Sequence, residues 1–353
     1  MELSALRKKI DLLDVKIIRL LNLRAGRALE IARAKARKGI SVYSPNREQE
    51  VLAKITAASK GLLSKQALEA IYREIMSASL ALGKKLAIAY MGPQASFSNL
   101  AAIKRFGSQV SYFSCASIPE VFQEVQRGAA DYGVVPIENS VEGAITHTLD
   151  MFMDTDLKIC AQIILEVAHN LLANCPRDLI SKVYSNPQVF GQCRIWLQKN
   201  FPRAEAIEVS STTRAAEIAA KEKNSACIAS LLAAKVYKLK VLAAGIEDSP
   251  HNITRFLVIG KNGTGVTGRD KTSIVFSIKD KVGALYEMLL PFKKYRINLT
   301  KIESRPSKKK AWDYYFFVDL EGHIENARVK KAVLELESKC RFLKVLGSYP
   351  VGE

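Results

Sequence analysis

The chain has 353 residues, enough for two or three domains that each have a core of their own. Hydrophobic residues make up 48% and charged residues 25%, which argues against a disordered or fibrous protein. No run of about 18 apolar residues occurs, so the sequence predicts no membrane-spanning helix. The net charge of +18 allows three interpretations: nucleic-acid binding, a solvated basic surface, or cations that gather small dianionic substrates. No helix-turn-helix, zinc-finger or RNP-like string favours nucleic acid.

The spacing of cysteine and histidine predicts no metal site and no disulfide framework. Six cysteines are widely separated and form no CxxC pair, and the four histidines form no HxH or HxxxH pair. We therefore expect reduced thiols in a cytoplasmic protein. The N-terminal residues pass directly into an amphipathic pattern without an apolar leader-like stretch, which favours the same location.

Residues 1–85 predict an all-helical domain. Apolar residues recur at alternating spacings of three and four, which is typical of the seam of a long helix: Leu3, Leu6, Ile10, Leu13, Ile17 and Leu20. Gly39 is expected to end this helix, and Ser44-Pro45 to open a second one. Ser64 is expected to cap a third helix that runs to about Leu82.

Two cations interrupt this seam. Arg24 takes the next seam position, and Lys35 follows 11 residues later on the same face, roughly 16 Å along the axis. Residues 1–85 hold 18 Lys and Arg against 8 Asp and Glu, so the basic excess is concentrated here. A buried guanidinium is costly unless an anion neutralises it, which indicates a dicarboxylate pocket between helices. The alternative is that both side chains extend to water along an exposed stripe.

Residues 86–262 alternate short apolar runs with helical patterns. Strands are expected at 86–90, 132–135, 226–229 and 256–259, and helices at 96–106, 117–128, 187–200 and 212–222. This alternation predicts a mostly parallel sheet with helices on both faces, long enough for two lobes that face a cleft. Unusual polar strings stand where the apolar runs stop, the place where open α/β sheets bind ligands: 92–98, 136–143, 185–193 and 248–256.

A glycine-rich linker at 260–268 separates a last module. Its expected order is strand 272–278, helix 283–295, strand 297–305, strand 312–320, helix 325–338 and strand 341–348. This βαββαβ order is ferredoxin-like.

The four polar strings, with Thr254-Arg255-Phe256 at their end, resemble prephenate dehydratase, and the flanking segments resemble the bifunctional chorismate mutase–prephenate dehydratase family. The resemblance implies an all-α chorismate mutase domain over 1–85 and an α/β, two-lobed, periplasmic-binding-protein-like dehydratase domain over 86–262. It also implies an α+β ferredoxin-like ACT domain over 271–353. The implied protein is a homodimeric or tetrameric enzyme of L-phenylalanine biosynthesis that needs no cofactor, because the first reaction is a unimolecular rearrangement and aromatisation drives the second.

The resemblance also assigns roles in the helical domain. Arg7 would reach into the partner subunit's site, while Arg24 and Arg47 would hold the carboxylates of chorismate. Lys35 would meet the ether oxygen that breaks, and Glu48 would accept the ring hydroxyl. Arginine suits carboxylates because its planar fork binds them with two hydrogen bonds and stays charged.

Two further positions depart from the family pattern. Ser44 replaces a usual Asp, whereas Ser79 would line the pocket as expected. Gly83 stands where the family places Gln or Glu, which donates to the same ether oxygen as Lys35. Losing such a donor costs on the order of 10²–10³ in rate, so a weakened mutase is expected unless Lys84 substitutes.

In the dehydratase, the resemblance places Thr254 at the leaving hydroxyl as a positioned donor. The expected catalytic residues are Thr254, Asn139, Ser185 and Gln192. The expected prephenate contacts are Ser96, Phe97, Asn139, Ser140, Ser185, Gln192, Ser211, Thr212, Thr213 and Phe256, of which the last is also expected in the core. At 211–213, helix capping is an equally good interpretation. Ala95-Ser96 replaces a usual Gly-Thr, which puts the shape of the first loop in doubt.

In the last module, two strings resemble phenylalanine-binding motifs of the ACT domain: Gly283, Ala284 and Leu285, and Glu303, Ser304, Arg305 and Pro306. The first would open a helix whose amides suit a carboxylate, and Glu303 could offset an ammonium group. The implied function is feedback inhibition by L-phenylalanine bound between the ACT domains of two subunits.

Two other functions stay open from the sequence. Arogenate dehydratase, with a degenerate mutase domain, would use the same scaffold on a substrate with an amino group in place of the keto group. A non-catalytic amino-acid-sensing or solute-binding protein would use the same two-lobed cleft, although the intact Thr254-Arg255-Phe256 string argues against it.

Overall fold

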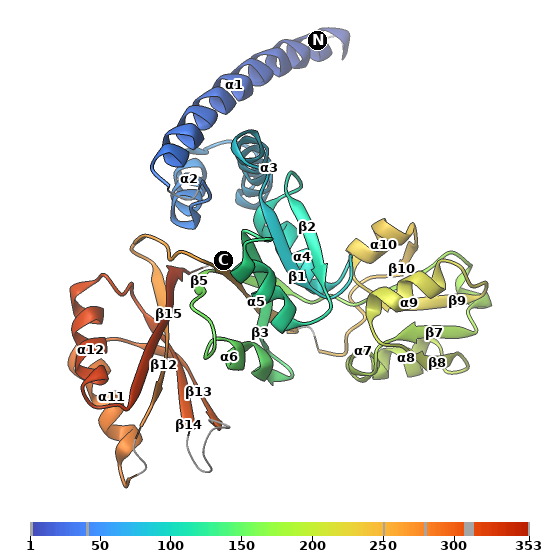
Figure 1. Ribbon diagram of the computed structural model, residues 1–353. Helices are drawn as coiled ribbons and strands as arrows, with labels where there is room; N and C mark the ends of the chain where they lie inside the picture. The colour runs from blue at the N-terminus through green and yellow to red at the C-terminus, as the bar shows by residue number, and fades with distance from the viewer. Residues whose placement is uncertain (1–2, 40–41, 250, 279–280, 307–313, 352–353) are drawn as a thin grey trace.

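The chain forms three bodies arranged in sequence order (Figure 1). A computed structural model describes residues 3–39, 42–249, 251–278, 281–306 and 314–351. Position 250, which belongs to the string before Thr254, and positions 312, 313, 352 and 353 of the expected last module lie outside the described residues. No helix in the described ranges combines the length and apolarity needed to span a membrane.

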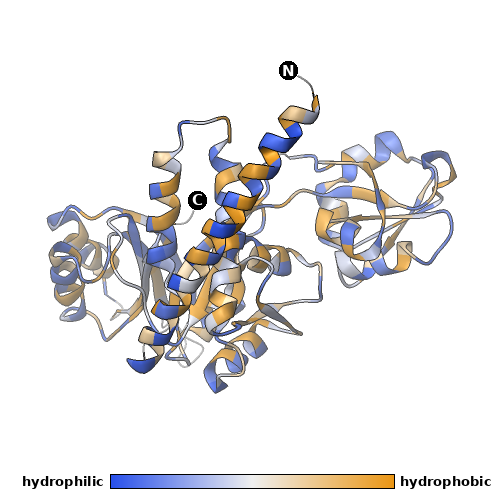
Figure 2. Ribbon diagram, turned by 90° about the horizontal axis from the view of Figure 1, so that it is seen from above, coloured by the Kyte–Doolittle hydropathy of each residue, from blue (hydrophilic) through white to orange (hydrophobic). Residues whose placement is uncertain are grey.

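The first body consists of α1 (Leu3–Arg37), α2 (Pro45–Ala58) and α3 (Lys65–Gly83), as the sequence predicts. The Ser64 side chain caps α3 by accepting from the Ala67 amide, and Gly39 takes a φ of +64° just beyond the end of α1. Although α1 is roughly 50 Å long, Ala32 is its only buried residue among those described. Its N-terminal half projects from the molecule with apolar residues exposed along it (Figure 2).

The first lobe of the second body has a six-stranded sheet of order β2-β1-β3-β11-β5, with β4 (Gly143–Ala144) on β3. Its strands are β1 (Ala87–Met91), β2 (Ser111–Cys115), β3 (Tyr132–Asn139), β5 (Lys158–Glu166) and β11 (Ile253–Gly260). Its helices are α4 (Phe97–Phe106), α5 (Ile118–Arg127) and α6 (Thr146–Met151). The strand predicted at 256–259 begins three residues earlier, so Thr254 lies within β11.

The second lobe has a five-stranded sheet of order β10-β6-β9-β7-β8. Its strands are β6 (Asn170–Ala173), β7 (Lys182–Ser185), β8 (Glu205–Glu208), β9 (Ser225–Ala229) and β10 (Lys240–Ala243). Its helices are the 3₁₀ turn η1 (Arg177–Leu179), α7 (Pro187–Gln192), α8 (Arg194–Asn200), α9 (Thr212–Ala219) and α10 (Leu231–Tyr237). The helix predicted at 187–200 is therefore two helices, broken at Cys193.

The expectation of a mostly parallel sheet is wrong for both lobes. In the first lobe, β11 runs antiparallel to β3 and to β5; in the second, β6 runs antiparallel to β9 and to β10. The physical reason is the path of the chain, which leaves the first lobe after β5 and returns through β11, so that the returning strand runs against its neighbours. Two crossing segments, between β5 and β6 and between β10 and β11, therefore join the lobes.

The third body is the βαββαβ module that the sequence predicts. Its antiparallel sheet has the order β13-β14-β12-β15. The elements are β12 (Asp270–Ser277), α11 (Ala284–Lys294), β13 (Leu299–Pro306), β14 (Tyr314–Glu321), α12 (Ala327–Glu337) and β15 (Phe342–Pro350). Both helices pack on one side of this sheet around Phe276 and Phe292.

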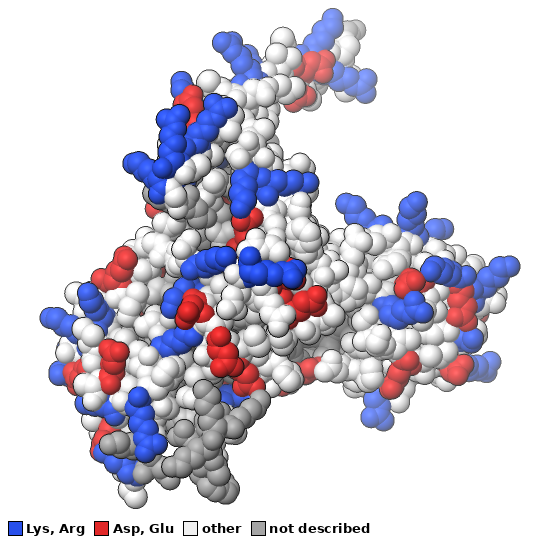
Figure 3. Space-filling view, in the orientation of Figure 1, with Lys and Arg blue, Asp and Glu red and all other residues white. Residues whose placement is uncertain are grey.

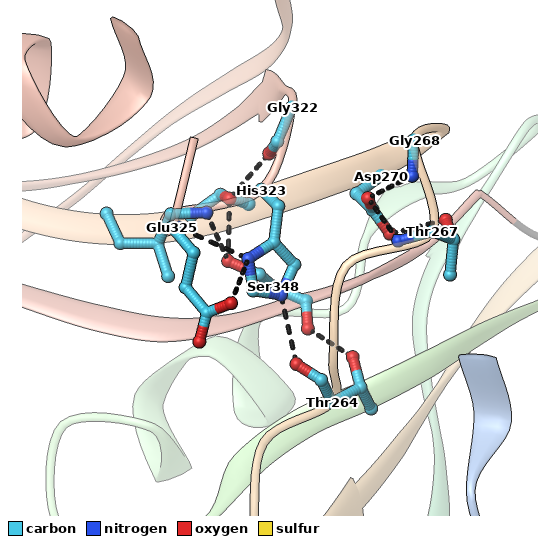
Figure 4. A network of polar contacts seen from close by, with 10 residues as sticks. Thr264, Thr267, Gly268, Asp270, Gly322, His323, Glu325 and Ser348 are labelled. Carbon is cyan, nitrogen blue, oxygen red and sulfur yellow. Dashed lines mark hydrogen bonds and ion pairs between the residues drawn. The ribbon is translucent and has the colours of Figure 1, made fainter. Parts of the chain in front are cut away.

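The glycine-rich linker is bound to the third body instead of hanging free (Figure 4). The amide of Glu325 can only donate, so His323 Nδ1 must accept and its Nε2–H donates to Thr264 O, at 2.9 Å. Thr264 Oγ1 donates to Ser348 O, and the Asp270 carboxylate accepts from the Thr267 hydroxyl. The linker therefore fixes where the third body begins.

The other face of the third sheet packs against the second body. Val275, Phe317 and Leu346 share one apolar core with Ile159 and Leu257 of the first lobe. A partly buried ion cluster lies at the same junction, between β3 and β11 of the first lobe and β13 and β14 of the third body. In it, Arg255 pairs with Asp319 and lies 3.7 Å from Glu138, and Glu138 lies 3.0 Å from Lys301.

Candidate active sites

Five polar side chains form a continuous hydrogen-bonded relay where the lobes meet. Thr254 faces Asn139 across the β11–β3 ladder, and Thr254 Oγ1 lies 2.8 Å from Asn139 Nδ2. The same Nδ2 lies 2.8 Å from Asn252 Oδ1, and Asn252 Nδ2 lies 2.8 Å from Gln192 Oε1. Gln192 Oε1 also lies 2.7 Å from His169 Nε2. The structure thus brings the predicted Thr254, Asn139 and Gln192 into one network.

Backbone amides set the direction of this relay. Asn139 Oδ1 lies 2.9 Å from the amide nitrogen of Val141 and 3.0 Å from that of Glu142. Because a backbone N–H can only donate, that atom must be the oxygen, and Nδ2 must point toward Thr254. Thr254 Oγ1 is therefore an acceptor from Asn139, and the proton of its own hydroxyl stays available for another acceptor.

The orientation of Asn139 also fixes the direction of the hydrogen bonds at Asn252, Gln192 and His169. Since Asn252 Oδ1 accepts from Asn139, its Nδ2 donates to Gln192 Oε1, and His169 must then donate through Nε2–H. Within the described residues, His169 Nδ1 is buried without a partner. Burial lowers the pKa of His169, because a second ring proton would lie in a place with no acceptor. The relay therefore ends in a neutral imidazole.

The loop before α4 reaches the same place. Phe97 packs edge-on against His169, with ring centroids 5.7 Å apart, and Ser96 caps α4 by accepting from the Asn99 amide. Ala95 has a φ of +68°, a conformation that favours glycine. The usual Gly that the sequence lacks here would thus suit the backbone.

Ser211 caps α9 by accepting from the Arg214 amide, as the capping interpretation predicts. Thr212 and Thr213 follow in the first turn, and both are buried. Thr213 Oγ1 has no hydrogen-bond partner in the described structure. The first turn of α9 therefore holds a buried hydroxyl whose hydrogen bonding is unsatisfied among the described residues.

Three of the predicted contacts have other partners. Ser185 is fully buried and donates to Ile228 O at 3.0 Å. Phe256 is 2% exposed in the apolar core of the first lobe, so the structure supports its expected core position and does not bring it to the relay. Ser140 Oγ donates to His251 O and accepts from the Ile253 amide, so it ties the end of β3 to the start of β11.

A second polar site is a cavity of about 300 Å³ between the three helices of the first body. It is lined by six of the predicted residues: Arg24, Lys35, Ser44, Arg47, Glu48 and Ser79. Arg24 Nη1 donates to Ser79 Oγ at 2.9 Å, and Lys35 Nζ donates to Val42 O at 3.1 Å. Partial burial lowers the pKa of Lys35. Cations therefore line this cavity, as the interrupted seam predicts. Figure 3 shows Lys and Arg side chains gathered on the outer surface of the helical body, in the upper part of the view.

Arg7 and Gly83 lie outside the lining of this cavity. Arg7 lies on the exposed N-terminal half of α1. Gly83 ends α3, and a Cβ built there would lie 2.7 Å from the Cβ of Ala32 on α1. Lys84 pairs with Asp131 of the second body at 2.5 Å and is not among the residues that line the cavity. The absence of a side chain at 83 therefore permits the close approach of α1 and α3.

The two strings of the third body lie on different elements. Gly283, with a φ of +77°, immediately precedes α11, which begins with Ala284. The string that starts at Glu303 ends β13, an edge strand of the sheet. Arg305 from this string forms an ion pair with Asp150 of α6, at 3.1 Å, so it contacts the second body.

Both sites offer a ligand charge and hydrogen bonds. Across the described residues, no three His, Cys, Asp or Glu side chains gather where they could hold a metal ion.

Known proteins match the chain in the same three parts. Family models for "Chorismate mutase type II", "Prephenate dehydratase" and "ACT domain" match residues 6–84, 88–264 and 272–338. The bifunctional chorismate mutase/prephenate dehydratase of Aquifex aeolicus is 51% identical over 99% of this chain and 98% of its own length. The chain belongs to the bifunctional chorismate mutase/prephenate dehydratase family.

Solved structures agree with this family assignment. Prephenate dehydratase from Arthrobacter aurescens, in complex with L-Phe, has a TM-score of 0.70 and 32% identity over 75% of this chain and 90% of its own. Prephenate dehydratase from Staphylococcus aureus has a TM-score of 0.66 and 30% identity over 75% of this chain and 100% of its own. The resemblance to the bifunctional family and the predicted three-part fold are both confirmed.

Two residues that the sequence analysis did not single out join these sites in this member of the family. His169 stands just before β6, a polar residue beside an apolar run, so the pattern that selected the other strings could have found it. Arg105, at the end of α4, pairs with Glu48 of the helical cavity at 2.9 Å. Nothing in the sequence pattern indicates that pairing, because the two residues come from different domains.

Proposed function

We propose that this chain rearranges chorismate to prephenate in the helical cavity and converts prephenate to phenylpyruvate at the relay. The observation that carries the second assignment is the uncommitted proton of Thr254, whose oxygen accepts from Asn139. The division into domains at 1–85, 86–262 and 271–353 is part of the proposal and agrees closely with the family matches.

Dehydration of prephenate requires the ring hydroxyl to leave as the ring carboxylate leaves as carbon dioxide. The electrons of the breaking C–C bond enter the ring, the C–O bond breaks, and the departing oxygen takes a proton to become water. Thr254 donates a hydrogen bond to that oxygen and so stabilises the charge that develops on it. Asn139 holds Thr254 in the donating orientation, and Gln192, whose Oε1 accepts from Asn252 and His169, turns its Nε2 toward Glu142 Oε1 at 3.4 Å.

The carboxylates of prephenate need anchors, and two helix starts offer them. Ser96 and Phe97 present the N-terminus of α4, and Ser211, Thr212 and Thr213 present that of α9, where the partial positive charge suits an anion. The unpaired buried hydroxyl of Thr213 supports a ligand there.

Rearrangement of chorismate requires a compact conformer and charge stabilisation at the breaking ether oxygen. In the helical cavity Arg24 and Arg47 bind the carboxylates, Lys35 donates to the ether oxygen, and Glu48 accepts the ring hydroxyl. We include a homodimer in the proposal, because the exposed apolar half of α1 needs a partner and Arg7 lies on it. A second copy packed there would bring Arg7 to its neighbour's cavity.

L-phenylalanine inhibits the dehydratase in this proposal by binding to the ACT domain at the 283–285 and 303–306 strings. The dehydratase relative whose structure contains L-Phe supports this effector. The ligand must bind two arrangements of the protein with unequal affinity.

The test is incubation of the full chain with chorismate, following prephenate and phenylpyruvate separately, with and without L-phenylalanine. We expect prephenate to appear first, phenylpyruvate to follow, and the second step to slow when phenylalanine is added. Formation of prephenate alone would remove the dehydratase assignment. The same assay with arogenate tests the alternative substrate, which the relatives' names do not favour.

A further inference from the structure

One wall of the helical cavity, the wall formed by Tyr43 and Glu48, packs against the dehydratase domain. Tyr43, which lines the cavity, is 3% exposed and belongs to the apolar core of the first lobe. Its ring lies 5.1 Å from that of Phe106 and 4.9 Å from that of Tyr132, measured between centroids. The residues that open α2 are therefore held against a domain that has its own separate reaction.

Arg105, the penultimate residue of α4, reaches Glu48 through this wall. Its Nη2 lies 2.9 Å from Glu48 Oε2, its Nε donates to the Tyr43 hydroxyl at 2.8 Å, and its guanidinium lies 5.8 Å from the centre of the Tyr43 ring. The side chains of Arg105 and Glu48 are 21% and 13% exposed. A carboxylate has about four acceptor positions, so this contact does not exhaust Glu48.

We propose that Arg105 is a positioning residue of the mutase site: it keeps Glu48 ionised and aimed into the cavity, so that two domains build one active site. The proposal rests on the assignment of the helical cavity to chorismate. Breaking a buried ion pair leaves a charge without compensation, and Glu48 would then rotate or take up a proton. In either case it would no longer accept a hydrogen bond from the substrate.

The electrostatic environment of Glu48 supports this role. Burial raises the pKa of Glu48, and the charge of Arg105 opposes that rise, with Tyr43 and Arg73 helping. The other charges that face the cavity are Arg24, Arg27 and Lys35 from α1 and Arg47 from α2. Removing Arg105 should therefore raise the pKa of Glu48 further. On acidification, Glu48 would then be protonated at a higher pH than in the wild type, and mutase activity should be lost at that higher pH.

The experiment uses the full chain with Arg105→Met, Arg105→Lys and a matched control, Arg127→Met. Arg127 likewise ends a dehydratase helix, α5, and pairs with an acidic neighbour, Glu124, but on the exposed surface. We expect Arg105→Met to lower the mutase kcat/KM by on the order of 10- to 100-fold, because a misplaced group costs that much. The acid limb of the mutase pH–rate profile should move to higher pH in Arg105→Met. Arg105→Lys should keep the wild-type limb with a smaller loss, and Arg127→Met should change neither.

Turnover of added prephenate in each sample reports whether the fold is intact. A Met variant with wild-type kcat/KM and limb, or one whose activity falls with an unmoved limb, would overturn the proposal. If the Met variant does not fold, the Lys variant decides: loss of mutase activity with the acid limb moved to higher pH, although the positive charge is kept, would contradict a charge-based role. If the wild-type chain itself leaves chorismate unchanged, the mutase assignment fails, which is a distinct result.

Discussion

The two candidate active sites of this chain differ in the kind of polar group that lines them. The helical cavity presents fixed charges, with four cations and one largely buried carboxylate on its walls. The dehydratase relay consists of amides, a hydroxyl and a neutral imidazole. Its effect on a ligand depends on the direction of each hydrogen bond, that is, on which atom donates and which accepts. The helical site should therefore respond most to changes of charge, and the relay to changes that reverse a hydrogen bond while keeping shape.

The largest expected effect is at Thr254, because its substitution should abolish one activity and leave the other unchanged. Thr254→Val keeps the shape and removes the donor, and we expect it to lower dehydratase turnover by on the order of 10³-fold. Thr254→Ser, which keeps the hydroxyl, should retain most of it. Both variants should rearrange chorismate at the wild-type rate. Substantial phenylpyruvate formation by the valine variant would defeat the assignment.

Reversing one amide should have the next largest effect. Asn139→Asp replaces the donor that faces Thr254 with an acceptor, so the threonine proton would turn toward the carboxylate. We expect dehydratase turnover at neutral pH to fall on the order of 10²-fold. Turnover should recover partly on acidification, as a protonated Asp can donate again. An unchanged rate would show that the direction of the relay does not matter.

A third test concerns the missing donor of the helical site. Gly83→Gln alone should cost roughly 1–3 kcal/mol of stability, because its Cβ would collide with Ala32. Pairing it with Ala32→Gly makes room, and this double variant should recover stability in part and then show whether the glutamine raises the mutase rate. Thermal unfolding and chorismate consumption measure the two effects. A single variant as stable as wild type would contradict the packing argument.

The smallest expected effect is at Ala95. Ala95→Gly relieves a left-handed backbone worth about 1–2 kcal/mol, but loses a buried methyl and adds freedom to the unfolded chain, so the net change should stay within about 1 kcal/mol. The matched control is Ala216→Gly, equally buried in the same core but within α9. It should cost about 2 kcal/mol, as no strain is relieved. Equal losses in both, read from chemical denaturation, would mean that Ala95 carries no strain.

Local patterns were sufficient to predict much of this molecule. The interrupted seam led from Arg24 to a real cavity, and the order of elements predicted the last module, because both depend on spacing along the chain. Parallel sheets were predicted wrongly, since the sequence does not show that the chain crosses to a second lobe and returns through β11. The direction of the relay also escaped prediction: it depends on two amides, of Val141 and Glu142, that fold back on Asn139. Pairings between domains, such as Arg105 with Glu48, leave no trace in local spacing.

The ion cluster at the junction with the ACT domain has a consequence for inhibition. Arg255 follows Thr254 directly, and its guanidinium is held by Asp319 of the ACT sheet. A tilt of that sheet large enough to separate this pair would take the nearer of two carboxylates from a largely buried guanidinium and leave it with Glu138 alone, one peptide away from the Thr254 hydroxyl. An effector bound to the ACT domain could thus slow the dehydratase reaction by shifting β11 and the Thr254 hydroxyl on it, without blocking access to the site.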